Sequence, residues 1–203
     1  MNYPQFWLHA SPKRKRIYSI AIMFVLAVLA TVIGLFVPMS PTEAKMVSDQ
    51  LNQTVTQGRA NGTLIPEIFF NNFPLCLAMF IPVAGAGIGL FILFTTGQAF
   101  RAVFDIQAAS LAANPATSPT PLPSLTPTTA ILALVGVGAV FLLEYVSYTI
   151  AMTESIWMFR RILQNRWKSE LRYLIIFIGI VALLLIIGAV VETYTIGIEA
   201  MIA

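Results

Sequence analysis

Long apolar runs alternate with shorter polar segments along the whole chain. Runs of about 20 apolar residues are typical of helices that cross a membrane. Such runs occupy residues 17–37, 130–156 and 174–196, and a still longer apolar stretch covers 68–112. The pattern predicts an all-α fold, a polytopic helical membrane protein whose single membrane domain covers residues 17–203.

The apolar stretch 68–112 is too long for one crossing. Its regularity is interrupted by Pro74, by Pro82 and by three closely spaced glycines. Pro and Gly within a membrane helix require neighbouring protein to satisfy the freed backbone groups. We expect two crossings here, near 68–90 and 92–112, which gives about five transmembrane helices with a broken one in the middle. A re-entrant hairpin is the alternative, because it also starts and ends on the same side of the membrane.

The basic residues indicate the orientation of these spans. Nine of the twelve Lys and Arg residues fall in two short clusters, at residues 13–16 and 160–172. The positive-inside rule favours the cytoplasm for both. We therefore expect a multi-pass protein of the cell membrane with a cytoplasmic N-terminus. This topology gives a basic cytoplasmic tail at residues 1–16 and two external loops, at 38–66 and 113–129. It also gives a basic cytoplasmic loop at 157–173.

The first predicted external loop contains two N-x-S/T sequons, at Asn52 and Asn61. Such sequons are acceptors for N-glycosylation in exposed loops of exported segments. Each is a weak signal alone, but both agree with the predicted topology.

Composition narrows the classes of function. Hydrophobic residues make up 58% of the 203 residues and charged residues 10%, whereas a soluble domain carries about 25% charged residues. The basic clusters lack interleaved stacking aromatics, so we expect no nucleic-acid partner. Cys76 and His9 are the single cysteine and histidine, so we expect neither a disulfide nor a dedicated metal site.

No nucleophile–base–acid motif and no phosphate-binding loop occurs in the sequence. We therefore expect a protein that is not an enzyme, with no catalytic residues and no cofactor. The lipid bilayer is the expected environment, with protein partners or further copies of the chain bound within it.

Glu144 lies in one of the most apolar parts of the chain. On a helix, Ser147, Tyr148, Ala151 and Ser155 share its face. A carboxylate inside a membrane span is costly, and such residues mark pathways, relays or partner contacts. Two interpretations remain open, since the same carboxylate can instead hydrogen-bond a neighbouring helix and fix the packing.

Further polar residues occupy other predicted spans. Glu192 follows Gly188 by four residues in the last span, and Asn71 and Asn72 begin the second. Arg101 and Asp105 lie four residues apart, a spacing that places them on one helical face and allows them to pair. We expect an internal network of Arg101 with Asp105, and with Glu144 as a further candidate. The candidate intramembrane polar network comprises Asn71, Asn72, Arg101, Asp105, Glu144, Tyr148 and Glu192.

Three glycines, Gly85, Gly87 and Gly89, follow Pro82 in the sequence PVAGAGIG. Small residues let membrane helices approach closely, which favours a packing seam. Broken helices also line substrate pathways in transporters. The sequence leaves both interpretations open.

Three stretches together resemble the stage II sporulation protein M family, and its archaeal-type members most. They are IFFNNFPLCLAMFIPVAGAGIGLFILFTTGQAF, FLLEYVSYTIAMTES and LLIIGAVVETYTI, in the same order over about residues 65–200. By this resemblance Asn71, Asn72, Glu144 and Glu192 match the polar positions of the family. The chain departs from the family in having Thr96–Gly97 in place of Asn-Gly, and it lacks a Pro-His before Glu144.

The resemblance implies an integral membrane protein with no known catalytic activity. The family's namesake works with partner proteins in a peptidoglycan-remodelling machine during engulfment. We therefore expect a non-catalytic scaffold or accessory subunit of a membrane complex. The alternative is a small transporter or channel that uses the polar residues around Glu144.

Overall fold

The computed structural model describes residues 9–113 and 127–202. The described residues form six helices and no strand, in agreement with the predicted all-α class. Most of the predicted loop 113–129 lies outside the described residues. The helices are α2 (Pro12–Leu35), α3 (Pro41–Asn61), α4 (Leu64–Ala78), α5 (Ala84–Ala113), α6 (Pro127–Leu163) and α7 (Trp167–Ile202).

Four of these helices, α2, α5, α6 and α7, are long and apolar enough to cross a membrane. Helix α4 is apolar but has only 15 residues, or about 22 Å at 1.5 Å per residue. The apolar core of a bilayer is about 30 Å thick. The fold is therefore that of a multi-pass helical membrane protein with four long helices and one short apolar helix. Among the described residues four helices are long enough to span a membrane, rather than the expected number of about five.

The reversal between α4 and α5 lies earlier than the sequence suggested. The chain turns at residues 79–83, so the predicted crossing 68–90 is divided between two helices. Val83 has a positive φ of 72° in this turn. The Ser155 hydroxyl donates to the Ile81 carbonyl at 2.6 Å, and the Gly85 amide donates to the same carbonyl at 2.8 Å. These two bonds satisfy the backbone carbonyl of Ile81 within the turn.

Most of the segment predicted as an external loop, 38–66, forms helix α3. Ser40 and Glu43 form a capping box, in which each side chain bonds the backbone N–H of the other residue. The hydrogen bonds from Ser40 lower the pKa of the exposed Glu43 carboxyl. Gly62 ends the helix in the left-handed conformation, at φ 67°.

The predicted basic segments are also largely helical. Helix α2 starts at Pro12 with Ser11 as its N-cap, so the last residues of the predicted tail belong to the helix. Helices α6 and α7 are joined by residues 164–166 only. The predicted loop 157–173 is therefore a tight helical hairpin. We call the end of the bundle that carries residues 12–16 and 157–173 the basic end, and the opposite end the far end.

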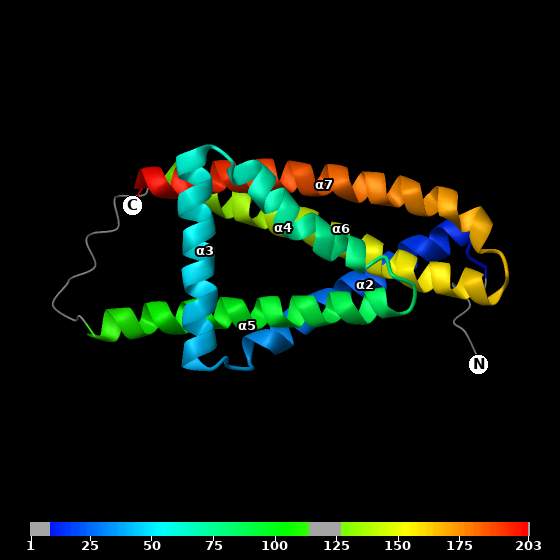
Figure 1. Cartoon of the computed structure of the whole chain (residues 1–203), viewed down its shortest axis with the longest axis horizontal. Helices are drawn as coiled ribbons and strands as arrows, with labels where there is room; N and C mark the ends of the chain where they lie inside the picture. The colour runs from blue at the N-terminus through cyan, green and yellow to red at the C-terminus, as the bar shows by residue number, and fades with distance from the viewer. Residues whose placement is uncertain (1–8, 114–126, 203) are drawn as a thin grey trace.

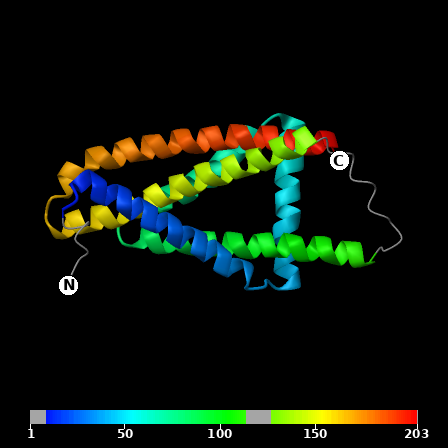
Figure 2. The same ribbon diagram turned by 180° about the vertical axis from the view of Figure 1, so that it is seen from behind.

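The long helices form two pairs that meet at the basic end and diverge toward the far end (Figure 1). Helices α6 and α7 pack along each other as a hairpin, and α2 packs along α5. Helix α2 starts beside α6 and α7 and finishes beside α5, so it joins the two pairs (Figure 2). Helix α4 packs on α7 and α6.

Helix α3 crosses the far end almost at right angles to the other helices (Figure 1). It contacts α5 near one end and α4 near the other. A guanidinium nitrogen of Arg59 donates to the carbonyl of Ile196 on α7. Helix α3 thus connects the two diverging helix pairs.

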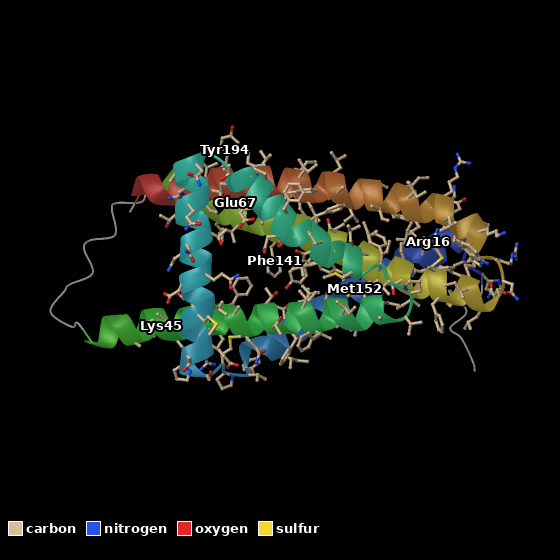
Figure 3. All side chains as sticks on the ribbon, viewed as in Figure 1. Arg16, Lys45, Glu67, Phe141, Met152 and Tyr194 are labelled. Carbon is tan, nitrogen blue, oxygen red and sulfur yellow. The ribbon has the colours of Figure 1, made fainter. Side chains whose placement is uncertain are left out.

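The core lies where α2, α4, α5 and α6 converge. Ala27, Cys76, Met79 and Met152 are fully buried there, and Met152 lies inside the bundle near the α4–α5 turn (Figure 3). Many large apolar side chains on the outer faces of the long helices are exposed instead. That distribution suits helices surrounded by lipid rather than water.

Candidate functional site

An interhelical hydrogen bond holds Glu144. The Asn72 side-chain amide on α4 donates to Glu144 Oε1 on α6 at 2.7 Å. Glu144 lies sixteen residues before Arg160 in the sequence, or about 24 Å along the helix. This depth falls within the roughly 30 Å apolar thickness of a bilayer whose surface lies near Arg160. The neighbouring Asn71 is exposed.

A cavity of about 240 Å³ opens beside this bond, between α5, α6 and α7. Two carboxylates, from Glu144 and Glu192, and the Thr195 side chain provide its polar lining. The apolar lining includes Phe100 and Phe141, and Phe141 lies on the side of α6 that faces α5 (Figure 3). The full lining is Phe100, Val137, Val140, Phe141, Glu144, Glu192, Thr195 and Ile196.

This cavity brings together residues from distant parts of the sequence. Asn72, Glu144 and Glu192 come from three helices and now lie around one point. A pair of carboxylates beside aromatic rings is suited to a cation, because the carboxylates supply negative charge and the ring faces attract positive charge. The same geometry also suits a purely structural role, in which the Asn72–Glu144 bond joins α4 to α6.

The two tyrosines that follow Glu144 lie in the core. Tyr148 is 6% exposed. The Tyr145 hydroxyl lies 2.5 Å from the Thr31 hydroxyl on α2, which itself donates to the Leu93 carbonyl on α5 at 3.1 Å. One chain of hydrogen bonds therefore connects α6, α2 and α5. Tyr145 and Thr31 were not among the candidate residues of the sequence.

Arg101 and Asp105 pair with each other within α5. Both carboxylate oxygens of Asp105 lie 2.8 Å from Arg101 Nε. The side chains are 43% and 54% exposed, so this pair lies on the surface of the bundle. Among the described residues, the hydrogen-bond partner of Glu144 is Asn72 rather than Arg101. The proposed extension of the Arg101 pair to Glu144 is therefore not present in this structure.

The three glycines of the α4–α5 region differ in their surroundings. A Cβ atom on Gly85 would lie 2.0 Å from the Met79 carbonyl oxygen, and one on Gly89 would lie 2.4 Å from the Met152 sulfur. A Cβ atom on Gly87 would meet open space. Gly85 and Gly89 thus permit close packing, whereas Gly87 lies on an open face.

A second polar cluster lies at the basic end, and sequence reasoning missed it. Arg16 on α2 forms ion pairs with Glu154 on α6, at 2.9 Å, and with Glu170 on α7, at 2.7 Å. Glu170 also pairs with Arg161 at 3.0 Å. The Arg16 guanidinium lies over the rings of Trp157, Tyr173 and Phe177 at 5.1–5.4 Å from their centroids.

One signal in the sequence pointed to this cluster. Glu154 is a second acid in the apolar helix of Glu144, and a membrane carboxylate requires a partner. The topology predicted from the sequence places Arg16 and Arg161 in the basic segments outside the membrane. Arg16 lies more than a hundred residues before Glu154 and Glu170 in the chain, and sequence spacing does not reveal contacts between residues so far apart.

Within the described residues, no group of three or more His, Cys, Asp or Glu side chains is arranged to hold a metal ion. Comparisons with protein-family models, curated proteins and solved structures find no match for this chain. The fold and the site together define a multi-pass helical membrane protein with an acidic cavity between its long helices.

Proposed function

We propose that this protein is a non-catalytic scaffold or accessory subunit of a membrane complex, with its basic end in the cytoplasm. One observation supports this most: its internal polar side chains bind one another across different helices. Asn72 binds Glu144, Tyr145 binds Thr31, and Arg16 binds both Glu154 and Glu170. Such bonds stabilise one arrangement of helices, as a scaffold requires.

The resemblance to the stage II sporulation protein M family belongs to the same proposal. Two of the positions that the resemblance selects, Glu144 and Glu192, line one cavity, and a third, Asn72, binds Glu144. This clustering supports a shared role for them. The family's partner-dependent role is the precedent for a membrane scaffold.

The test is purification of the tagged protein from its native membrane in mild detergent, followed by mass measurement of the particle. A scaffold is expected in a particle well above the 22.2 kDa of the chain, with partner proteins or further copies in a fixed ratio. A tagged, unrelated four-span protein from the same membrane is the control. Recovery of the monomer alone, under conditions that preserve other complexes, contradicts the proposal.

The acidic cavity favours a second candidate, a small cation transporter or channel. Its two carboxylates and two aromatic rings provide a cation with both charge and ring contacts. This candidate requires flux across a reconstituted membrane that depends on Glu144. Glu144→Gln keeps the size of the side chain and one oxygen that can accept the bond from Asn72, but removes the charge. It is the variant that separates the two functions.

A further inference from the structure

A second cavity, of about 200 Å³, lies at the basic end between the start of α2 and the end of α6. A water molecule occupies about 30 Å³ of liquid, so the cavity has room for a group the size of a phosphate. Three cationic side chains line it, those of Lys15, Arg160 and Arg161. Its remaining lining is Pro12, Trp157 and Gln164.

The positive charge around this cavity exceeds the local negative charge. Arg16 and Arg161 are matched by Glu154 and Glu170, their partners in the ion pairs described above. Neither Lys15 nor Arg160 forms an ion pair with any other residue that the structure describes. Two uncompensated cations therefore face a space that none of the described acidic side chains lines.

Aromatic and apolar side chains place this cavity at the level of lipid head groups. Trp157 lines the cavity, and the Arg160 guanidinium lies 5.5 Å from its ring centroid. Tryptophan is enriched at the boundary between head groups and acyl chains. Ile156, one helical turn deeper than Arg160 on the same face, is 40% exposed and offers an apolar surface for an acyl chain.

We infer that this cavity binds the phosphate of an anionic membrane phospholipid. Lys15 and Arg160 neutralise the phosphate, Arg161 and the Gln164 amide offer further donors, and Trp157 contacts the lipid at the base of the head group. Basic pockets between membrane helices bind anionic head groups in this way. A lipid held here contacts both α2 and α6, and so strengthens the junction of the two helix pairs.

The experiment is native mass spectrometry of the purified full chain, titrated with short-chain phosphatidylglycerol or phosphatidylcholine. We expect the wild-type protein to bind phosphatidylglycerol more tightly. Each basic residue near an anionic surface contributes about a factor of five to binding. The double variant K15Q/R160Q is thus expected to lose roughly 30-fold in affinity for phosphatidylglycerol, and K15Q alone about fivefold.

The matched control is K13Q/R166Q, which removes the same charge from two exposed residues that do not line the cavity. It is expected to bind within about threefold of wild type, because these two exposed side chains do not line the cavity and solvent screens their charge. Equal losses in both double variants would show a diffuse basic surface and overturn the inference. Unchanged binding by K15Q/R160Q, or equal affinity of the wild type for both lipids, would overturn it as well.

A competition experiment shows whether the cavity binds a lipid or a soluble anion. Inorganic phosphate and glycerol 3-phosphate share the phosphate group but lack acyl chains. We expect neither to displace phosphatidylglycerol at equal concentration, and displacement by either overturns the lipid assignment. If K15Q/R160Q fails to fold, the charge-preserving K15R/R160K replaces it, and this variant must retain the preference for phosphatidylglycerol.

Discussion

Arg16 is the residue on which the junction of α2, α6 and α7 depends most. Its guanidinium contacts two carboxylates and three aromatic rings, while its side chain is only 16% exposed. Removal of Arg16 leaves Glu154, whose side chain is 4% exposed, without its counter-charge. An uncompensated buried charge is among the costliest defects in a folded protein.

We predict that Arg16→Ala lowers the free energy of unfolding by about 3–5 kcal/mol. Arg101→Ala serves as the matched control, because it also removes an ion-paired arginine, but from an exposed pair. That variant is expected to cost about 0.5 kcal/mol or less. The measurement is thermal unfolding in detergent, followed by size-exclusion chromatography, and equal melting temperatures for the two variants would contradict the assignment.

Asn72 is a second single residue that joins two helices, because its side chain binds Glu144. Asn72→Ala removes a hydrogen bond between α4 and α6, and such bonds between membrane helices contribute about 1 kcal/mol. We therefore expect a small but measurable drop in melting temperature. Asn71→Ala changes the exposed neighbouring position and is expected to have the same melting temperature as the wild type. The interpretation fails if Asn71→Ala is the more destabilising of the two.

At the scale of elements, α2 and α5 approach so closely that only glycine fits at their contact. A Cβ atom on Gly34 would lie 2.1 Å from the Phe94 carbonyl oxygen, and one on Gly97 would lie 2.1 Å from the Thr31 carbonyl oxygen. These glycines form the seam between α2 and α5. They were not among the glycines that the sequence singled out.

Gly34→Ala is expected to separate α2 from α5 and to destabilise the protein by about 1–3 kcal/mol. Gly87→Ala is the control, because its added Cβ meets open space and alanine is the better helix former. It should be neutral or slightly stabilising. Thermal unfolding of both variants checks the prediction, and a stable Gly34→Ala would show that the seam is looser than described.

The capping box of α3 gives this helix a pH dependence. Because the folded-state pKa of Glu43 is lowered, the ionised carboxyl contributes stability above its ordinary pKa of about 4.3. That contribution is lost as the pH falls through the lowered value. We expect weaker protection against amide exchange in the first turn of α3 at acidic pH, measured relative to the intrinsic exchange rate at the same pH. Glu43→Gln should abolish this pH dependence of the protection, and protection in Glu43→Gln that still falls with acid would point to another group.

The sequence predicts helices and contacts between residues that are close in the chain, but not contacts between helices that are far apart in the chain. The apolar runs indicated α2, α6 and α7, and the spacing of Arg101 and Asp105 indicated their pairing within one helix. Helix α3 was missed because it is polar, although its Ser40–Glu43 capping box and Gly62 are local signals. The Arg16 cluster and the Asn72–Glu144 bond depend on how distant helices pack, which one sequence does not determine.

For the molecule as a whole, polar bonds join the helices in several places. One group joins α2, α6 and α7 at the basic end, and another joins α4 to α6 beside the acidic cavity. The chain of Tyr145, Thr31 and the Leu93 carbonyl joins α6, α2 and α5. Helix α3 connects the diverging pairs at the far end. We propose that these polar groups hold the helices together and do not conduct ions.

The most direct test is cation flux into proteoliposomes that contain the purified protein. Wild type, Glu144→Gln and Asp105→Asn are compared with empty vesicles, with Asp105 as an acid outside the cavity. The scaffold account predicts that all three proteins give the flux of empty vesicles. Flux that wild type and Asp105→Asn support and Glu144→Gln abolishes would contradict that account and establish the cavity as part of a pathway.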